Sequence, residues 1–372
     1  MSNVHTALKV VIDVRPAGDS PVGIGQYVTN LVSALAALEE SPSLVLLGDR
    51  AVDRDSFPLG PKCQLLILPD GLGWHVRARK MFSSVQGDIY HSPSSALVPL
   101  TLRRRAVLTV HDLAPAISPG VSTVKTRLAY LVLRLATRAS GRVIAVSQAT
   151  LERMEALWGK SDRTTVILEA PRPFPDCPSR ERLDSILGGM APYFLAVGTQ
   201  EPRKNFERLV SAFEQATHDK ERFPRLVIAG KPGWGATPRF LETAVERLSP
   251  NLLVLGFTTD QDLACLYRHA RAFVIGSLDE GFGLPALEAM SFGSPVAASR
   301  RGALPEVLGK AALYFDAEDE QEIGAVFCRL ADDDELCREL KRRSLERAKI
   351  FSWASTASQT LEVYRSLKLE LE

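Results

Sequence analysis

The chain has 372 residues, of which 45% are hydrophobic and 24% are charged, and its net charge is +1. These values are typical of a globular protein that is long enough for two domains, each with its own core. The five cysteines are scattered and include no C-x-x-C pair, which argues against a zinc site or a disulfide framework and favours a reducing, cytoplasmic setting. No stretch reaches about 18 uninterrupted apolar residues, and the start does not resemble a signal peptide, so we expect neither a membrane span nor secretion.

Positive charge is concentrated in the first half of the chain. Residues 1–180 hold 21 lysines and arginines against 15 acidic residues. Basic residues gather at 75–81 and along an amphipathic helical pattern at 123–140. Two interpretations stay open for these stretches, a solvated helix face or a peripheral contact with anionic membrane lipid. Nucleic acid is not expected as a partner, because the basic patches lack interleaved aromatic residues.

Short apolar runs alternate with helical patterns along the first half. Strands are predicted at "LKVVIDV", "RAVLTVHD", "RVIAVS" and "TTVIL", and helices at "GQYVTNLVSALAAL", at 123–140 and at "QATLERMEALWG". This alternation indicates a parallel sheet with crossover helices.

A proline-rich stretch then interrupts the pattern. Residues 169–179, "EAPRPFPDCPS", contain four prolines in eleven residues, so we predict an interdomain linker with little to pack against. The alternation restarts at "YFLAVGT" and "NFERLVSAFEQAT" and continues to "AALYFD" and "DEQEIGAVFCRLADD". The simplest account is an α/β fold of two doubly wound domains in tandem. Such sheets bind ligands outside the carboxyl ends of their strands, so the cleft between the domains is the expected site.

Two strand ends of the first domain carry candidate site residues. Gly23 and Gly25 lie between the first strand and its helix, where bare backbone at a helix N-terminus suits an anionic group. The G-x-G-x-x-G fingerprint is incomplete because Val28 occupies its third glycine position, so a plain tight turn stays open. His111 and Asp112 end another strand, and for this pair both local hydrogen bonding and acid–base catalysis are open.

In the second domain, "VGTQEPRKNFERLV" places Arg203 and Lys204 at a strand end and beside a helix N-terminus. Two such cations predict a phosphate site, with the arginine as a fork and the lysine as a point charge. Asn205 is placed to cap the helix that follows. The next strand-end loop, "AGKPGWG", contains Lys231 and Trp234 and suits a flat ring.

The stretch "LDEGFGLPALEAM" at 278–290 holds two carboxylates, Glu280 and Glu288. Pro285 fits the first position of a helix and fits badly inside one, so we predict a loop followed by a helix that starts at Pro285. Glu288 then lies in the first turn and can accept two hydroxyls from a ribose, whereas Glu280 lies in the loop. A pyrophosphate would be attracted to the helix entrance by the backbone amides of Phe282, Gly283 and Leu284.

These motifs together resemble a known family. "EGFGLPALEA", "GTQEPRKN", "AGKPGWG" and "RGALPEVLGKAALYFD" look like the second domain of retaining glycosyltransferases of family 4, which have the GT-B fold. The resemblance covers nearly the whole chain and is strongest over residues 193–320. It implies two Rossmann-like domains that face an interdomain cleft. The acceptor-side domain would span 1–175, with a final helix at 354–372 that crosses back onto it, and the donor-binding domain would span 190–353.

The resemblance also implies roles for individual residues. The substrate would be a nucleotide-sugar donor, with no metal and no cofactor. Catalytic roles fall to His111, Arg203, Lys204 and Glu280. Donor binding is assigned to a larger set: Gly23, Gly25, Gly198, Arg203, Lys204, Lys231, Phe257, Glu280, Phe282, Gly283, Leu284 and Glu288.

Members of this family retain the anomeric configuration of the sugar that they transfer. A covalent glutamate intermediate is conceivable, but same-face substitution is favoured because Glu280 is assigned to sugar hydroxyls. The first-domain motifs look most like bacterial mannosyltransferases of O-antigen and exopolysaccharide synthesis, so GDP-mannose is the expected donor. A UDP-sugar donor and a GT-B nucleotide-sugar epimerase are the alternatives. The expected acceptor is a lipid-linked saccharide at the inner face of the cytoplasmic membrane.

Overall fold

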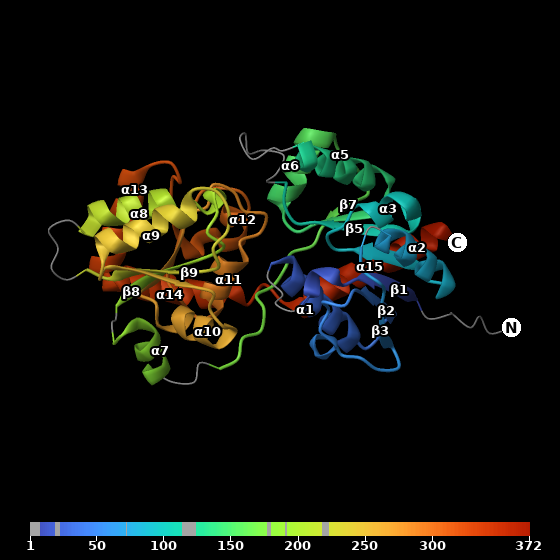
Figure 1. Ribbon diagram of the computed structural model, residues 1–372, viewed down its shortest axis with the longest axis horizontal. Coiled ribbons are helices and arrows are strands. Elements are labelled where there is room, and N and C mark those ends of the chain that lie inside the picture. Colours follow the sequence, from blue (N-terminus) through green and yellow to red (C-terminus); the bar gives the residue numbers. More distant parts are fainter. Residues whose placement is uncertain are drawn as a thin grey trace. The chain divides into compact units, whose positions relative to one another are not determined.

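A computed structural model gives the fold of the chain (Figure 1). The structure describes residues 8–18, 23–71, 73–113, 124–176, 180–189, 192–217 and 223–372. The chain divides into two compact units, each with its own sheet and core. Unit 1 comprises residues 1–170 and 352–372, and unit 2 comprises residues 171–351.

The described part of unit 1 forms a parallel sheet of seven strands in the order β3-β2-β1-β4-β5-β6-β7. The strands are β1 Lys9–Asp13, β2 Ser43–Gly48, β3 Cys63–Ile67, β4 Ile89–Ser92, β5 Ala106–Val110, β6 Arg142–Ala145 and β7 Thr164–Val166. The helices are α1 Ile24–Ala37, α2 Trp74–Ser84, α3 Leu97–Leu102, α5 Val124–Ala139, α6 Gln148–Trp158 and α15 Trp353–Leu371. The strand order reverses between β1 and β4, and the switch point of a doubly wound sheet lies there.

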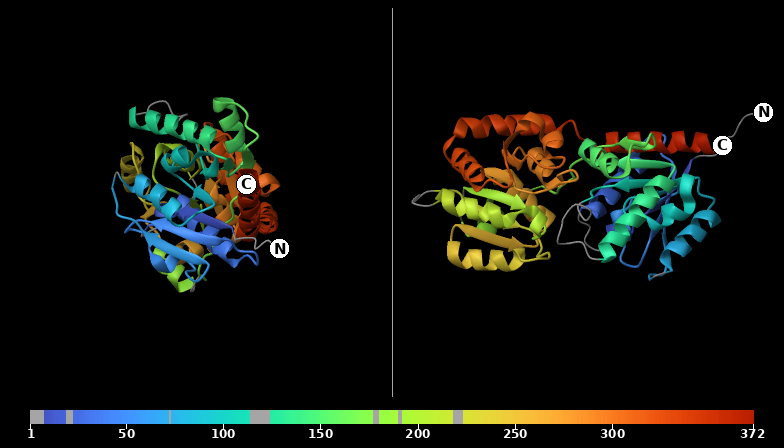
Figure 2. Two further views of the ribbon diagram at one scale, coloured as in Figure 1. Left: turned by 90° about the vertical axis from the view of Figure 1, so that its right-hand side faces the viewer. Right: turned by 90° about the horizontal axis from the view of Figure 1, so that it is seen from above.

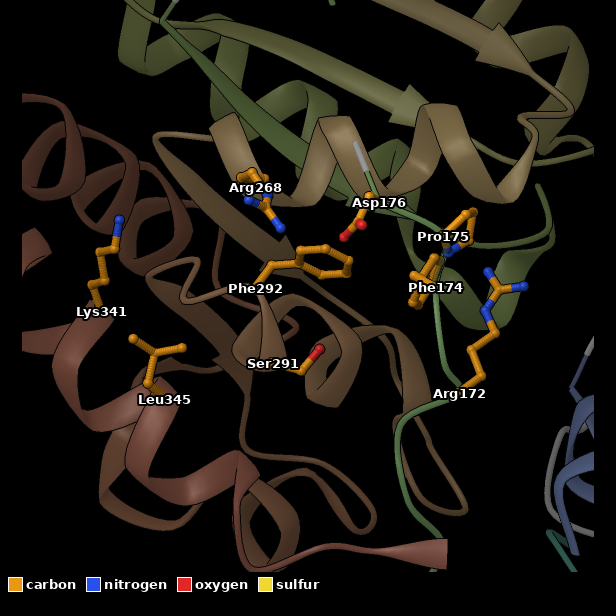
Figure 3. Close-up of a pocket in the computed structure, with 9 residues that line it drawn as sticks. All are labelled: Arg172, Phe174, Pro175, Asp176, Arg268, Ser291, Phe292, Lys341 and Leu345. Carbon is orange, nitrogen blue, oxygen red and sulfur yellow. The ribbon is translucent and has the colours of Figure 1, made fainter. Parts of the chain in front are cut away.

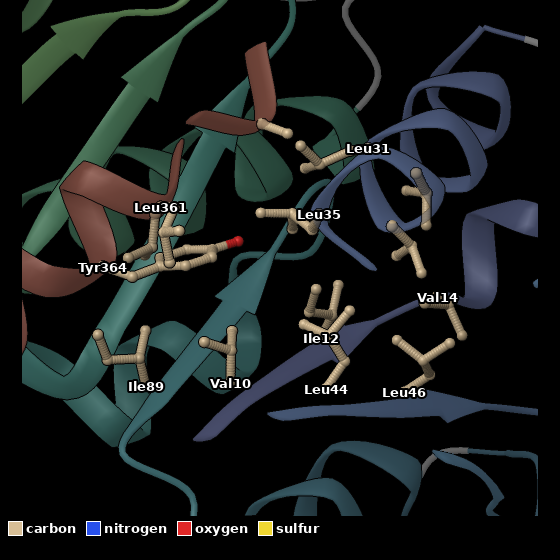
Figure 4. Packing of buried hydrophobic residues seen from close by; sticks show 14 of the residues in the cluster. Val10, Ile12, Val14, Leu31, Leu35, Leu44, Leu46, Ile89, Leu361 and Tyr364 are labelled. Carbon is tan, nitrogen blue, oxygen red and sulfur yellow. The ribbon is translucent and has the colours of Figure 1, made fainter. Parts of the chain in front are cut away.

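Alternate residues of each strand supply two separate cores in unit 1. Val10 and Ile12 of β1 pack with α1 and α15 on one face, whereas Val11 packs with Trp74 of α2 on the other face. Figure 4 shows the first of these cores, with Tyr364 of α15 among the strand residues. Burial of such side chains stabilises a fold by about 1.5–3 kcal/mol each. The last helix of the chain is therefore a structural part of unit 1, and Figure 2 shows it, in red, beside the unit 1 sheet.

The described part of unit 2 forms a parallel sheet of six strands in the order β10-β9-β8-β11-β12-β13. The strands are β8 Tyr193–Val197, β9 Arg225–Ala229, β10 Leu252–Gly256, β11 Ala272–Ile275, β12 Val296–Ser299 and β13 Ala312–Phe315. The helices are α7 Arg180–Leu187, α8 Phe206–Thr217, α9 Thr237–Leu248, α10 Asp260–His269, α11 Leu284–Ser291, α12 Leu304–Leu308, α13 Glu320–Asp332 and α14 Asp334–Ala348. Helices α8, α9 and α13 cover one face, and α10, α11 and α14 cover the other (Figure 1).

The predicted fold class is confirmed, because both units are parallel sheets with helices on their two faces. The sequence patterns did not predict β2, β3 and β4. Between β2 and β3 the chain makes only a short 3-10 turn at Arg54–Ser56, so the alternation of strand and helix on which the prediction relied is interrupted there.

Two smaller expectations are wrong. The linker stretch does find packing partners, since the Phe174 ring lies 5.3 Å from the Phe292 ring and 5.9 Å from the Tyr267 ring. Cys265 on α10 is disulfide-bonded, although the scattered cysteines gave no sign of a disulfide. Pairing depends on distance in the folded chain, which cysteine spacing alone does not give.

Candidate functional site

The strand order of unit 2 reverses between β8 and β11. Arg203 and Lys204 follow β8 on a 3-10 turn at Pro202–Lys204, and Glu280 follows β11. The carboxyl ends of neighbouring parallel strands meet at one edge of a sheet, so the fold brings these three side chains together. This edge is where open α/β sheets bind their ligands.

Glu280 is held by two cations and a hydroxyl. Its Oε1 lies 2.6 Å from Lys204 Nζ and accepts a hydrogen bond from Ser277 Oγ at 2.7 Å, and its Oε2 lies 3.2 Å from Arg203 Nη1. Burial by itself raises the pKa of this carboxyl. The charges of Lys204 and Arg203 and the hydrogen bonds prevail, and they hold the pKa below its ordinary value. Glu280 is therefore ionised at neutral pH.

Arg203 and Lys204 are each fixed by further contacts. Arg203 Nη2 lies 2.8 Å from Glu201 Oε1, and Arg203 Nη1 donates to the backbone carbonyl of Asp279 at 2.8 Å. A Cβ atom at Gly198 would lie 3.2 Å from Lys204 Cε, so the absence of a side chain there gives the lysine room to lie along the strand end. The two cations are thus held at the switch point before any ligand binds.

The helix of the Glu280–Glu288 motif, α11, begins at Leu284, one residue earlier than predicted, with Pro285 in its second position. Glu288 is therefore its fifth residue and lies beyond the first turn, contrary to the prediction. Gly283 caps it with a φ of 94°, and a Cβ there would lie 2.6 Å from Leu304 Cδ2, so a glycine is required. The first N–H groups of a helix have no acceptor within the helix. The ring of Phe282 is buried against Phe351 at 6.0 Å, so only the backbone of Phe282 is available to a ligand.

Glu288 has different partners from Glu280. Its Oε1 accepts from Arg172 Nε at 2.9 Å, and its Oε2 accepts from the Tyr267 hydroxyl at 3.0 Å. Burial raises the pKa of Glu288 above its ordinary value, although Arg172 and Tyr267 act in the opposite direction. The structure therefore separates the two carboxylates into two hydrogen-bonding environments.

The residues predicted to face a flat ring lie on the loops that follow β9 and β10. Lys231 Nζ lies 4.6 Å from the centre of the Phe257 ring, and that ring is largely exposed. Trp234 Nε1 donates to Glu201 Oε2 at 3.1 Å, which connects this loop to the loop of Arg203. Adjacent strands place Lys231 and Phe257 side by side, as a site for a nucleobase would need.

Asn205 does not cap α8 with its side chain, contrary to the prediction. Its Nδ2 donates to the carbonyls of Gly276 and Ala317 at 3.0 and 2.8 Å, and its Oδ1 accepts from Arg208. The residue has a φ of 58°. Asn205 therefore joins three loops beneath the cation pair instead of satisfying the start of a helix.

In unit 1, His111 pairs with a residue far along the chain. Its Nδ1 lies 2.8 Å from Glu169 Oε1 and its Nε2 lies 3.0 Å from the Pro93 carbonyl oxygen. The Tyr27 ring packs edge-on at 4.7 Å. Both ring nitrogens therefore have an oxygen partner within hydrogen-bond distance. Glu169, and not Asp112, is the carboxylate that orients this histidine.

The glycine loop of unit 1 is described only in part, because residues 19–22 lie outside the described residues. Gly23 caps α1 with a φ of 52°, and Gly25 is buried in the first turn of that helix. Gly23 ends the loop after β1 and Gly25 follows it in α1, at the switch point of the unit 1 sheet. Their assignment to a donor phosphate stays a prediction.

The sequence analysis missed several residues that hold the predicted ones in place. Ser277 and Glu201 contact the Glu280 cluster, Arg172 and Tyr267 hold Glu288, and Glu169 holds His111. Ser277 lies within three residues of Glu280 and was close enough to be suspected. Glu201 lies only two residues from Arg203. The contacts of Arg172, Tyr267 and Glu169 join parts of the chain that are far apart in sequence and left no local signal.

A cavity of about 460 Å³ lies on unit 2, at the end of α11 that is opposite to Gly283 (Figure 3). Its lining includes Arg172, Phe174, Arg268, Phe292 and Lys341. None of the residues predicted to bind the donor lines it, so it is not the predicted donor site.

Two further observations bear on the kind of site. Across the described residues, no three or more His, Cys, Asp and Glu side chains gather in a way that could hold a metal ion. The same part of the chain contains no helix with the length and hydropathy needed to cross a membrane.

Solved structures share this fold. Sucrose-phosphate synthase from Thermosynechococcus elongatus superposes with a TM-score of 0.80 at 24% identity, and the match covers 97% of this chain and 99% of that one. The two parallel sheets and this match define the fold as GT-B, which confirms the predicted fold.

Sequence comparison extends the result to the family. The profile of "Glycosyl transferases group 1" matches residues 180–347, and that of "Glycosyltransferase Family 4" matches residues 21–168. "O-antigen chain mannosyltransferase B" of Escherichia coli is 32% identical over 97% of this chain and 100% of its own length. "Serotype-specific mannosyltransferase WbdA" of Escherichia coli is 38% identical over 47% of this chain, a match that spans 22% of WbdA. The chain belongs to glycosyltransferase family 4 and is a glycosyltransferase.

Proposed function

We propose that this glycosyltransferase transfers mannose from GDP-mannose to a saccharide acceptor, with retention of the anomeric configuration. The relative that matches the whole chain is named an O-antigen chain mannosyltransferase, and WbdA is also named a mannosyltransferase. The observation that carries the proposed chemistry is the cluster of Arg203, Lys204 and Glu280 at the switch point of unit 2.

In the proposed reaction, the bond between the sugar C1 and the diphosphate oxygen breaks, and its electron pair leaves with the diphosphate. Arg203 and Lys204 stabilise the charge that develops on the leaving group, and the N-terminus of α11 adds its dipole. This stabilisation grows as the bond breaks, so it lowers the barrier more than it strengthens ground-state binding. No metal or cofactor takes part in the proposed scheme.

Glu280 is proposed to bind hydroxyls of the transferred mannose. Its two oxygens already contact Lys204, Ser277 and Arg203, which disfavours it as a covalent nucleophile. The acceptor hydroxyl therefore attacks C1 from the face that the diphosphate leaves, and its proton passes to the departing phosphate oxygen. His111, held by Glu169, is assigned to the transferred sugar.

A donor screen tests this proposal. The purified chain is incubated with GDP-mannose and with UDP-glucose, UDP-galactose and ADP-glucose, with and without a mannose-terminated oligosaccharide, and released nucleotide is quantified. Preferential use of GDP-mannose, with an α-linked product by NMR, supports the proposal. Preferential use of a UDP-sugar would replace the donor, and an epimerised sugar in the absence of acceptor would replace the reaction.

We further propose that the acceptor is lipid-linked and that unit 1 contacts the membrane surface. On α5, Leu128, Leu131 and Leu135 are exposed at helical spacing, and Arg138 is exposed in the same helix. The side chains of residues 124–127 lie outside the described part of the structure. The surface combines apolar area with positive charge, as helices that lie on anionic bilayers do. Replacing the three leucines by glutamate is expected to abolish sedimentation with phosphatidylglycerol vesicles and to leave transfer to a water-soluble acceptor unchanged.

A further inference from the structure

The first residues of unit 2, 171–176, form a segment that passes beside Glu288. Arg172 lies in this segment, and its guanidinium bridges two carboxylates, with Nε 2.9 Å from Glu288 Oε1 and Nη1 2.7 Å from Asp260 Oδ1. Its side chain is 13% exposed, so the contact with Glu288 is shielded from water. Figure 3 shows Arg172 and Phe174 near each other along this segment.

Aromatic packing fixes the segment in place. The Arg172 guanidinium lies over the Phe174 ring at 4.4 Å, and Phe174 packs edge-on against Tyr267 and Phe292. Tyr267 and Phe292 stack on each other at 5.8 Å. Tyr267 in turn donates its hydroxyl to Glu288, so the groups that hold the arginine also hold the second oxygen of the carboxylate.

The contacts leave Glu288 able to bind hydroxyls. A carboxylate offers about four acceptor positions on its two oxygens, and the contacts with Arg172 and Tyr267 use one position on each. Arg172 also favours the charged form of Glu288, against the effect of burial. The carboxylate is thus held in place by a residue 116 positions earlier in the chain.

The second partner of Arg172 lies on a different loop. Asp260 is the first residue of α10 and follows the loop after β10 that carries Phe257. Phe257 belongs to the predicted base site, and Glu288 to the predicted ribose site. One guanidinium therefore connects helix α11, which carries Glu288, with the start of α10, which follows the loop of Phe257.

We propose that Arg172 is a positioning residue for the donor nucleoside, which fixes the Glu288 carboxylate against the ribose hydroxyls and the loop after β10 against the base. The inference rests on the proposed role of Glu288 in binding ribose. Arg172 lies outside all the sequence motifs from which the donor site was predicted.

The chain offers a matched control. Arg182 on α7 contacts Asp262 on α10 through Nε at 2.6 Å and Nη2 at 2.9 Å, and its side chain is 49% exposed. This arginine–aspartate pair involves the same helix α10, two residues beyond Asp260, and both of these hydrogen bonds go to Asp262. Arg182→Ala removes a comparable ion pair and leaves the nucleoside loops intact.

The experiment measures binding of GDP and of 2′-deoxy-GDP by calorimetry to the wild-type chain, Arg172→Ala, Arg172→Lys, Arg182→Ala and Glu288→Ala. Wild type is expected to prefer GDP, because Glu288 accepts the 2′-hydroxyl. Arg172→Ala is expected to weaken GDP binding about tenfold, as loss of a charged hydrogen bond can, with a much smaller effect on 2′-deoxy-GDP. Its GDP preference should therefore approach that of Glu288→Ala, while Arg182→Ala keeps the wild-type preference.

The ratio of the two affinities separates positioning from a general loss of structure. Arg172→Lys should restore part of the preference, because a lysine reaches one carboxylate as a point charge and does not bridge two. A wild-type ratio in Arg172→Ala overturns the inference, whether or not the variant is less stable by thermal unfolding. If the wild type binds neither nucleotide, the proposed role of Glu288 fails first and the inference falls with it.

Discussion

Glu280 and Glu288 are eight residues apart in the sequence and equally buried, with 6% of each residue exposed. Their pKa values nevertheless move in opposite directions. Burial is the largest influence on both carboxyl groups, and by itself it raises the pKa of each. At Glu280 the charges of Lys204 and Arg203 and two hydrogen bonds reverse the effect of burial, so the pKa falls below its ordinary value. At Glu288 burial prevails, and the pKa stays above its ordinary value.

The difference lies in the number of positive partners. Glu280 contacts two cations, whereas Glu288 contacts one cation and one neutral hydroxyl. The nearby Asp260 also raises the pKa of Glu288, and it forms a second ion pair with Arg172. The two carboxylates are equally buried, yet Glu280, beside the predicted phosphate site, has a lowered pKa. Glu288, at the predicted ribose site, has a raised pKa.

Removing the cation that distinguishes Glu280 should have the largest effect. Lys204→Ala is expected to lower the turnover number about 100-fold, because a positive charge that stabilises the leaving group is lost. The measurement is steady-state transfer from GDP-mannose, with Lys310→Ala, an exposed lysine on the 3-10 turn after α12, as the control. Near-wild-type turnover in Lys204→Ala would contradict the proposed role of Lys204 in stabilising the leaving diphosphate.

Alanine substitutions of the two glutamates should weaken binding of different parts of the donor. Glu288→Ala is expected to weaken both GDP and GDP-mannose about tenfold, since a ribose contact is common to both ligands. Glu280→Ala is expected to weaken GDP-mannose about tenfold as well, but to change GDP affinity little, because GDP has no mannose hydroxyls. Calorimetric titration of both ligands into both variants checks this, and an equal loss of GDP affinity in the two variants would contradict the separate roles.

The opposite pKa shifts should also appear in stability, with smaller effects. Glu280 has a lowered pKa in the folded chain, so its ionised form stabilises the fold above its ordinary pKa, and this contribution is lost as the pH falls through the folded-state pKa. Glu288 has a raised pKa, so its contribution is present below its ordinary pKa and is lost as the pH rises through the folded-state pKa.

At pH 7, Glu280→Gln should therefore lower the unfolding temperature and Glu288→Gln should raise it slightly or leave it unchanged. Both differences from wild type should shrink as the pH falls towards 4. Thermal unfolding followed by calorimetry at several pH values measures them, and shifts of the same sign in the two variants would show that the two sites do not differ in the way described.

Much of the fold could be predicted from the chain because its signals are local. Each β-branched run followed by a helical period gives a strand and its crossover helix, as at β8 with α8 and β9 with α9. The cation pair and the two glutamates could also be chosen in advance, because they follow strand ends and strand ends form the binding edge of such sheets. Of the three strands that the patterns did not predict, only β3 has no α-helix between it and the strand before it.

Periodicity, glycine and proline positions and family motifs act over a few residues, so they predict the class of protein, the two parallel sheets and the candidate residues of the donor site. Which charges meet depends on the tertiary structure. Lys204 reaches Glu280 across 76 positions and Arg172 reaches Glu288 across 116. These pairings set the protonation of each carboxylate, and they depend on strand order and on the path of the linker segment, which no local pattern encodes.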